Sequence, residues 1–322
     1  MNMGKVKVLA GLLLCACSDD TVGQNILQQD WVEKGAVRFL VLGDAGEGNE
    51  SQYQVADAMA SVCDQWGCDF ALYLGDNFYD VGVENIDDEQ FESKFEQPYS
   101  GLDFPFYVVL GNHDYGLLGN EWSQPSPQVA YTDRSAKWVL PDRYYRHVHQ
   151  HVTLYGLDSN AIMWDTEWGG ADEQLRCLGE ARDGSTTSWN IAYAHHPYLS
   201  NGSHGNAGAY EGIEGIPVIS GETMKDFVED GVCGDMDVFF AAHDHQLEWL
   251  EPTCGTEFVV SGAGSKTRSM VDRGAASLFV YDETPGFLWV EIVDDILVGV
   301  FYDQDGVALY EREVVRMAKA SE

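Results

Sequence analysis

The chain has 322 residues, of which 45% are hydrophobic and 22% are charged. This length and composition suit one large domain or two small ones with a sizeable core, and they exclude disorder as the general state. With 53 acidic and 18 basic residues the formal net charge is −35, which opposes binding to nucleic acid or anionic lipid through a basic patch. A phosphate substrate would be repelled at long range, so bound cations would have to reverse the field locally.

The first residues predict an export signal at positions 1–17. Lys5 and Lys7 precede a short apolar run, and small residues follow before the chain turns polar, as in a secretory signal. The run is too short for a membrane-spanning helix, which needs about 20 apolar residues. Leu14-Cys15-Ala16-Cys17 also resembles a bacterial lipobox with Cys17 as the lipid-bearing residue; cleavage without lipid attachment is the alternative. We therefore expect an exported protein, either a periplasmic or surface lipoprotein of a bacterial cell envelope or a secreted protein.

Five cysteines follow Cys17, and an exported protein is permitted to form disulfides. Sequence alone does not fix their connectivity. Two close pairs could each form a bridge, one across a small loop and one across a hairpin-sized loop, which would leave an odd thiol. The pairs are Cys63 with Cys68 and Cys233 with Cys254, and the odd residue is Cys177.

Residues 18–36 are polar and lack a clear period, so we expect a tether there, followed by a single domain over residues 37–322. Helices are expected, in chain order, at residues 51–65, 87–97, 172–181 and 222–229. Strands are expected at residues 39–42, 70–74, 106–110, 152–157, 189–194, 237–242, 257–260, 276–280, 287–292, 297–302 and 307–311. The alternating first half and the strand-rich second half suit an α/β fold with two stacked sheets and helices outside.

Side chains that can bind metal ions follow four of these apolar runs directly. Because open α/β sheets place ligand sites at the carboxyl ends of their strands, we expect these side chains to converge. Carboxylates, an amide and imidazoles gathered from several strand ends favour a metal centre with two ions. A single aspartate of this kind is most often a turn or helix cap, so the prediction depends on all four stretches. They are Gly43-Asp44-Ala45-Gly46, Gly75-Asp76-Asn77-Phe78-Tyr79, Gly111-Asn112-His113-Asp114 and His243-Asp244-His245.

With these stretches and a fifth, Ala194-His195-His196-Pro197, the chain resembles the calcineurin-like metallophosphoesterases, specifically the purple acid phosphatases of the short, tartrate-resistant type. The resemblance covers roughly residues 38–264, and a tyrosine three residues after Asp76 is typical of this subgroup. Ala194 and Ala242 stand where glycine is frequent in the family. Further matching stretches are Gln128-Val129-Ala130-Tyr131, Trp138-Val139-Leu140-Pro141, Tyr144-Tyr145-Arg146 and Ser261-Gly262-Ala263-Gly264.

The resemblance implies a four-layer α/β/β/α metallophosphoesterase sandwich of two stacked mixed sheets, with two metal ions bridged by Asp76. A hard trivalent ion favours carboxylates and a phenolate, whereas a softer divalent ion accepts imidazoles and an amide oxygen. A shared carboxylate can hold two ions about 3.5–4 Å apart. The implied ligands of iron(III) are Asp44, Asp76, Tyr79 and His245. Those of the divalent ion, which would be iron, zinc or manganese, are Asp76, Asn112, His195 and His243.

The family pattern also places two further histidines, His113 and His204, where they face the substrate. Imidazole titrates in the range needed to bind a phosphoryl group or to protonate a leaving alkoxide. The alternative for His204 is a surface histidine in a flexible loop. The pattern His-x-Pro selects His195 as the ligand, so the adjacent His196 is expected to support the site or to face solvent.

Three more histidines alternate in a candidate strand and would therefore share one face. They are His147, His149 and His151. Three imidazoles could bind zinc, but no carboxylate or cysteine completes the set, so a structural role is favoured.

The expected activity is that of an acid phosphatase, which hydrolyses phosphomonoesters by direct attack of a metal-bound hydroxide without a covalent phospho-enzyme. No Gly-x-Ser-x-Gly nucleophile elbow occurs in the chain. Expected substrates are phosphate-ester small molecules or phosphoproteins, with no nucleic-acid partner and membrane contact only through the N-terminal lipid. The alternatives are a phosphodiesterase or nucleotidase on the same metal core, which the loops at residues 116–127 and 200–215 would decide, and a catalytically inactive surface-anchored binding protein.

Overall fold

The computed structural model of the chain describes residues 35–167 and 169–316. The predicted export signal at residues 1–17 and nearly all of the tether at residues 18–36 lie outside these ranges. Among the described residues, no helix combines the length and the apolar character needed to cross a membrane.

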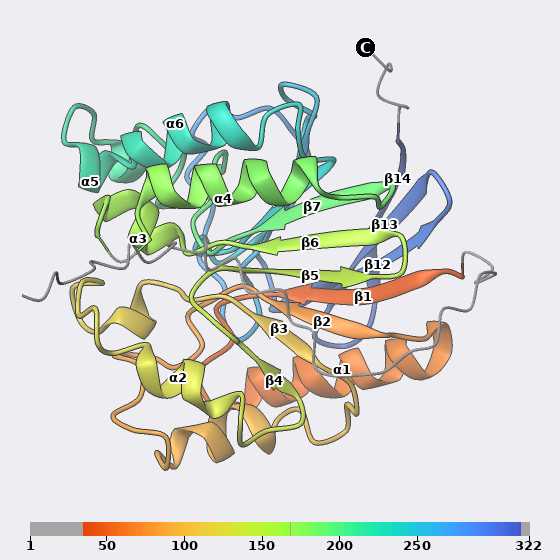
Figure 1. The fold of residues 1–322 in the computed structure, drawn as a ribbon. Coiled ribbons are helices and arrows are strands. Elements are labelled where there is room, and N and C mark those ends of the chain that lie inside the picture. Colours follow the sequence, from red (N-terminus) through yellow and green to blue (C-terminus); the bar gives the residue numbers. More distant parts are fainter. Residues whose placement is uncertain (1–34, 168, 317–322) are drawn as a thin grey trace, which may run out of the picture.

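Two seven-stranded sheets are formed by the described residues, and they stack on each other (Figure 1). The first has the order β14-β13-β12-β1-β2-β3-β4, with β1 to β4 parallel and the three C-terminal strands antiparallel. Its strands are β1 (Val37–Leu42), β2 (Phe70–Tyr73), β3 (Phe106–Val108), β4 (Trp138–Val139), β12 (Gly286–Val293), β13 (Ile296–Asp303) and β14 (Ala308–Val315).

The second sheet has the order β11-β9-β10-β8-β7-β6-β5. Its central strands β6, β7, β8 and β10 are parallel, whereas β5, β9 and β11 run antiparallel to their neighbours β6, β10 and β9 respectively. Its strands are β5 (Tyr145–His149), β6 (Val152–Gly156), β7 (Trp189–Tyr193), β8 (Val238–Ala241), β9 (Leu247–Leu250), β10 (Glu257–Ser261) and β11 (Ser277–Tyr281).

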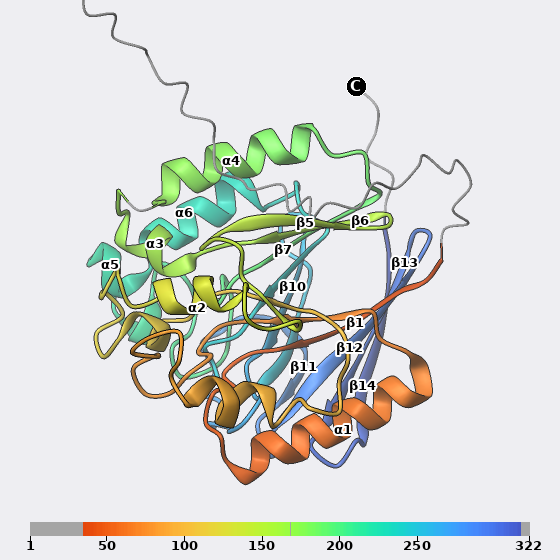
Figure 2. The ribbon, with the colours of Figure 1, turned by 60° about the horizontal axis from the view of Figure 1, so that its bottom comes forward.

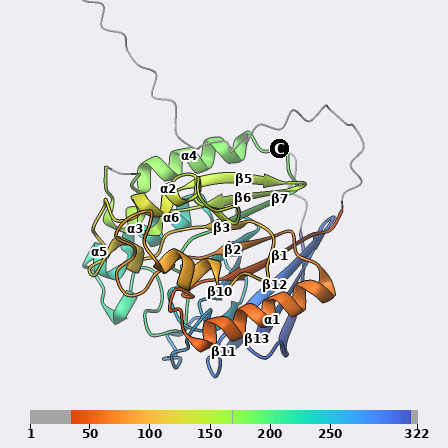
Figure 3. The same cartoon turned by 90° about the horizontal axis from the view of Figure 1, so that it is seen from below.

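Helices cover the outer faces of both sheets, which gives the predicted α/β/β/α layering and confirms the fold class. Helices α1 and α2 lie outside the first sheet, and Figures 2 and 3 show α1 running beneath it. Helices α3 to α6 lie outside the second sheet (Figure 1). The helices are α1 (Glu50–Trp66), α2 (Ser126–Tyr131), α3 (Ser159–Trp164), α4 (Ala171–Asp183), α5 (Pro217–Ser220) and α6 (Glu222–Gly231). Shorter helical turns are η1 (Glu92–Glu96), η2 (His113–Tyr115) and η3 (Tyr210–Gly212).

Helix α1 illustrates how local sequence forms these elements. Asn49 precedes it, and its side chain accepts a hydrogen bond from the backbone N–H of Gln52, which satisfies one of the free donors of the first turn. Val55, Met59 and Val62 are buried along one side, as the apolar stripe predicts. The chain leaves the helix at Gly67, where φ is 84°, a conformation that glycine adopts without a steric penalty.

Aromatic side chains dominate the layer between the sheets. Phe39 stacks on Phe70 with ring centroids 4.9 Å apart and meets Phe240 of the other sheet edge to face at 6.1 Å. Trp249 of the second sheet is fully buried and meets Phe301 of the first sheet edge to face at 6.2 Å. Each side chain of this size contributes about 1.5–3 kcal/mol by leaving water, so this layer fixes how the two sheets face each other.

The structure departs from the sequence predictions at a few elements. Residues 87–97 were expected to form one helix, but the regular part is the single π-helical segment η1. Strands β4 and β9 and helices α2, α3 and α5 were not predicted. His151 lies after the end of β5 and not on it, so only His147 and His149 share the expected strand.

Both predicted disulfides are present, Cys63 with Cys68 and Cys233 with Cys254. The expectation that Cys177 is an odd thiol is wrong, because it too is disulfide-bonded.

Candidate metal centre

The predicted metal ligands all lie on loops that leave the carboxyl ends of parallel strands. The matched registers of β1 with β2, of β2 with β3 and of β7 with β8 align these ends. Stacking the two sheets then brings the two sets of loops together at one edge. Asp44 follows β1, Asp76 and Tyr79 follow β2, Asn112 follows β3, His195 follows β7, and His243 and His245 follow β8.

The backbone at three of these ligands adopts the left-handed conformation. The φ angles are 55° at Asp44, 51° at Asp76 and 67° at His243. This conformation costs a residue other than glycine about 1–3 kcal/mol and persists only where the surroundings impose it, most often at functional sites. Its repetition at three converging side chains therefore supports a functional role for this edge of the molecule.

Glycines allow the loops to approach each other closely. A Cβ atom on Gly111 would lie 2.2 Å from Oδ1 of Asp76, and one on Gly43 would lie 2.4 Å from Cβ of Ala242. Neither separation is sterically allowed. Ala242, which stands where the family often has glycine, thus fits because its neighbour Gly43 lacks a side chain.

The first expected set of ligands meets around Asp44. The hydroxyl of Tyr79 donates to Oδ1 of Asp44 at 2.8 Å, and Nε2 of His245 lies 3.4 Å from that oxygen and 3.4 Å from the tyrosine hydroxyl. The backbone N–H of His243 donates to Oδ2 of Asp44 at 2.8 Å. Asp44 and Asp76 also form, with His195, a group whose ligand atoms lie within 4.8 Å of one another.

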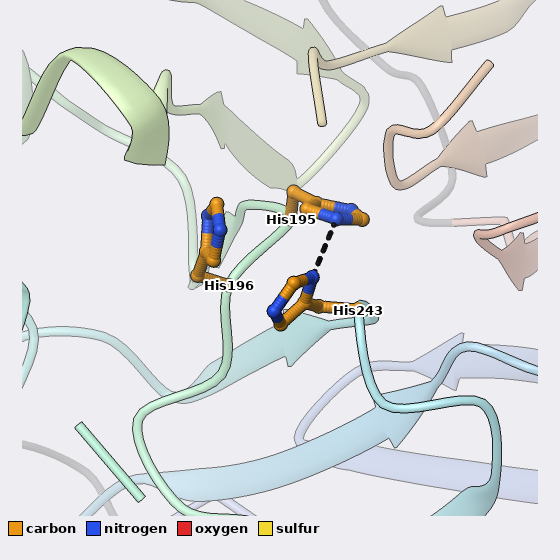
Figure 4. Close-up of side chains that lie close together, drawn as sticks. All are labelled: His195, His196 and His243. Carbon is orange, nitrogen blue, oxygen red and sulfur yellow. Dashed lines mark hydrogen bonds between the residues drawn. The ribbon is translucent and has the colours of Figure 1, made fainter. Parts of the chain in front are cut away.

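The second expected set meets around His195. Nε2 of His195 lies 3.1 Å from Oδ1 of Asn112, 3.1 Å from Nδ1 of His243 and 3.4 Å from Oδ1 of Asp76. Figure 4 shows the His195 and His243 rings directed toward each other. The other nitrogen of His195, Nδ1, lies 2.8 Å from the carbonyl oxygen of Leu74 and therefore carries the proton of the neutral ring. Nε2 then presents a lone pair to two oxygen acceptors, an arrangement that a cation satisfies.

The charges within this cluster point the same way. Burial lowers the pKa of His195, but Asp76 and Asp44 outweigh it and raise that pKa. Burial and the neighbouring His204 and His196 keep the pKa of His243 well below its usual range, so its ring is neutral. Burial, reinforced by Asp44 and Asp76, raises the pKa of the Tyr79 hydroxyl well above its ordinary value. The buried carboxylates of Asp44 and Asp76 are thus stabilised by a positive charge between them, and Tyr79 can ionise only with a cation beside it.

His196 lies beside this cluster, and its Nδ1 is engaged elsewhere. The hydroxyl of Ser159 lies 2.8 Å from that nitrogen and accepts the backbone N–H of His196 at 3.1 Å. Together with His195 and His243 its ring could offer a third nitrogen, but its bond to Ser159 agrees with the supporting role expected for it.

The two predicted substrate-facing histidines flank the cluster. Nδ1 of His113 lies 2.6 Å from the carbonyl oxygen of Asp80, and its Nε2 lies 3.9 Å from Oδ2 of Asp76. The ring of His204 lies against that of His243, tilted by 35° with ring centroids 4.1 Å apart. His204 also lines a cavity of about 320 Å³ together with Asn112 and His243.

Two carboxylates support the site without belonging to the expected sets of metal ligands. Asp114 accepts the backbone N–H of Gly111 at 2.8 Å and is fully buried; burial and Asp76 raise its pKa to about 7. Asp244 accepts the backbone N–H of His204 at 2.8 Å and the hydroxyl of Ser200 at 2.6 Å. Asp244 therefore holds the loop that carries His204. In the sequence, the only sign of this role is that Asp244 lies between two predicted metal ligands.

Two of the three remaining histidines have partners outside the site. Nε2 of His147 lies 2.6 Å from the hydroxyl of Tyr107, and Nε2 of His149 lies 3.9 Å from Oδ2 of Asp69. Among the residues placed by the structure, they belong to neither of the groups able to hold an ion.

Curated relatives resemble the chain over most of its length. It is 30% identical to purple acid phosphatase 3 of Arabidopsis thaliana, over 93% of this chain and 83% of that protein. It is 28% identical to tartrate-resistant acid phosphatase type 5 of Homo sapiens, over 88% of this chain and 92% of that protein.

Solved structures share the fold at lower sequence identity. The structure of GAP50, described as the anchor in the inner membrane complex of Plasmodium, superposes with a TM-score of 0.70 at 18% identity, over 88% of this chain and 90% of that one. A dimetal phosphatase from Danio rerio gives a TM-score of 0.55 at 11% identity, over 87% and 99% of the two chains. Residues 37–247 match the family described as calcineurin-like phosphoesterases. The chain therefore belongs to the calcineurin-like metallophosphoesterases, in the part of that family that contains the purple acid phosphatases.

Proposed function

We propose that this metallophosphoesterase is an acid phosphatase that holds iron(III) and a divalent ion and hydrolyses phosphomonoesters. The observation that carries the proposal is the meeting of acceptor atoms around His195, whose Nε2 faces Oδ1 of Asn112 at 3.1 Å and Oδ1 of Asp76 at 3.4 Å. Buried acceptors in contact are unfavourable unless a proton or a cation lies between them. The similarity to acid phosphatases over most of the chain supports the same activity.

The donor atoms fit two different ions. Asp44, Tyr79 and His245 offer a carboxylate, a phenol and an imidazole to a hard trivalent ion, whereas Asn112 and His243 offer an amide oxygen and a neutral imidazole to a softer one. Asp76 lies between the two sets. Ions of this kind, when bound, act as Lewis acids toward phosphate oxygens and lower the pKa of a coordinated water.

The protein side chains position the ester and handle the proton. The carbonyl of Asp80 fixes His113 at Nδ1, so Nε2 of this half-buried ring faces the site, where a protonated ring can donate to the leaving oxygen. The leaving group has room in the cavity beside His204 and His243, whose apolar wall includes Leu118 and Trp164. The apolar wall of this cavity favours a substrate whose leaving group is organic.

The test measures metal content, the visible spectrum and hydrolysis on the same preparation. We expect iron with a second metal, a purple or pink colour from iron bound to the Tyr79 phenolate, and faster hydrolysis of an aryl phosphate than of a bis-aryl phosphate. Asn112→Ala should lose at least about a hundredfold in kcat, given the effect of ligand loss at metal sites. Asn85→Ala, which removes an amide from an exposed turn, serves as the matched control.

Each alternative has its own outcome. Faster cleavage of the diester would favour a phosphodiesterase, and faster release of phosphate from nucleotides than from aryl phosphate would favour a nucleotidase. Metal-loaded protein that hydrolyses none of these esters would favour an inactive binding protein. Colourless active protein that contains only zinc or manganese would overturn the iron assignment while leaving hydrolysis in place.

A further inference from the structure

Both ring nitrogens of His204 are already engaged by neighbouring side chains. Nδ1 is hydrogen-bonded to the carboxylate of Glu211, and Nε2 lies 3.0 Å from Nη1 of Arg268. A guanidinium group only donates hydrogen bonds. His204 must therefore accept at Nε2 and carry its proton on Nδ1, where Glu211 accepts it.

This chain of hydrogen bonds changes the role that His204 can play. Nε2 of His204 accepts a hydrogen bond from Arg268, so it carries no proton that it could donate to a leaving oxygen. For the same reason it cannot donate a hydrogen bond to a phosphoryl oxygen, which is itself an acceptor. The group presented to an anion beside His204 is thus the guanidinium of Arg268. Its planar fork of N–H donors matches two phosphate oxygens at once.

The charge of Arg268 has no direct carboxylate partner among the residues that the structure places. Several basic side chains elsewhere do pair with a carboxylate, such as Lys266 with Glu47 at 2.5 Å and Arg312 with Glu257 at 2.7 Å. Arg268 is exposed and lacks such a direct pair among the described residues of a chain with 53 acidic and 18 basic residues. Glu211 compensates it only through the imidazole of His204.

The position of Arg268 is fixed at the edge of the metal cluster. Its backbone N–H donates to the carbonyl oxygen of His245 at 2.9 Å, and Nη1 also donates to the hydroxyl of Ser203 at 3.1 Å. The backbone of Arg268 is therefore tied to that of a predicted metal ligand, and its side chain reaches across to the loop of His204. The neighbouring Arg273 holds that loop from the other side by donating to the carbonyl oxygens of Gly202 and Ser203.

We infer that Arg268 is a substrate-binding residue that contacts the phosphate oxygens of the ester, and that His204 positions it by linking it to Glu211. This inference rests on the proposed phosphatase function for the identity of the substrate. The guanidinium of Arg268 supplies the local positive charge that an anionic substrate needs when it approaches a molecule of formal charge −35.

The test compares Arg268→Gln and Arg268→Lys with wild type, using inorganic phosphate as the binding probe and an aryl phosphate as the substrate. We expect Arg268→Gln to weaken phosphate binding and to raise KM by about tenfold, the effect of one charge-assisted hydrogen bond, with a smaller change in kcat. Arg268→Lys should fall between the two, because lysine keeps the charge but not the fork. Arg176→Gln removes an equal charge from the exposed face of helix α4 and should leave both quantities unchanged.

The outcomes separate this inference from the proposed function. Phosphate affinity of Arg268→Gln within twofold of wild type, with its thermal midpoint intact, would overturn the inference. Faster turnover by Arg268→Gln would also overturn it, since the arginine would then block His204. If the wild type binds phosphate more tightly than Arg268→Gln but hydrolyses no ester, the inference stands and the phosphatase proposal fails.

Discussion

Histidines of this protein differ in pKa because their surroundings differ. His195 faces two buried carboxylates, which raise its pKa against the effect of burial. His147 is half-buried beside another histidine, and burial together with His149 lowers its pKa to about 4. Residue type alone gives each of them an ordinary pKa near 6.5, so the differences between their pKa values could not be predicted from the sequence.

The lowered pKa of His147 predicts a loss of stability in acid. Its folded pKa of about 4 lies below the unfolded value of 6.5, so the neutral ring stabilises the fold above pH 6.5 and this contribution is lost as the pH falls toward 4. The shift corresponds to at most about 3 kcal/mol of unfolding free energy. In His147→Gln, whose amide can still accept from Tyr107, the difference in unfolding free energy between pH 7 and 4.5, measured in urea, should shrink. An equal difference in both proteins would contradict this.

Lys266 predicts a change in the colour of the iron-loaded protein. Its Nζ lies 3.3 Å from the centre of the Tyr79 ring, where a cation stabilises the electrons of the phenolate. Removing it should ease charge transfer from the phenolate to iron, so Lys266→Met should shift the visible band to longer wavelength. Lys225→Met, which removes an exposed lysine paired with Glu229, is the matched control and should not move the band. A shift to shorter wavelength in Lys266→Met would refute this reading.

At the level of secondary structure, the site is formed by the ends of strands and by the glycines that follow them. Strands β1, β2 and β3 each end in an apolar run followed by glycine and a predicted ligand. These strands could be predicted from their apolar runs, because parallel strands that are covered on both faces are continuously hydrophobic. Strand β9 was missed because buried Glu248 interrupts its apolar pattern, and its hydrogen bonds to Asn201 and Ser277 come from distant segments.

Gly111 tests the need for close approach at these strand ends. In Gly111→Ala the new Cβ would lie 2.2 Å from both the backbone nitrogen and Oδ1 of Asp76, so Asp76 must move. We expect this variant to lose bound metal, which elemental analysis measures. We also expect its free energy of unfolding to fall by about 1–3 kcal/mol, as at other overpacked sites. Gly179→Ala in helix α4, where no atom lies within 4 Å of the added carbon, should instead stabilise by about 0.5–1 kcal/mol. Full metal content in Gly111→Ala would show that Asp76 does not depend on this contact.

The molecule as a whole carries a formal charge of −35, and such self-repulsion destabilises the compact state. Raising NaCl from low concentration to about 0.2 M shortens the screening length to below 10 Å. We therefore expect the thermal midpoint to rise over this range, by several degrees for a charge this large. An uncharged solute at equal osmolality should produce a smaller rise. A midpoint that stays constant or falls would mean that pairs such as Arg312 with Glu257 outweigh the net repulsion.

The sequence by itself determined the chemistry available and the order in which it appears. Apolar runs followed by glycine and a ligand predicted where strands end, and the close spacing of Cys63 and Cys68 suggested their bridge. These features are local, so a single segment contains all the information needed to recognise them.

The tertiary structure decided which groups meet. The stacking of the two sheets brings His195 and His243 against Asn112, and the neighbouring carboxylates raise the pKa of His195. The link from Glu211 through His204 to Arg268 joins two loops separated by more than 50 residues. Contacts of this kind depend on the relative placement of whole layers, which the buried faces of both sheets fix together and which no single stretch of sequence encodes.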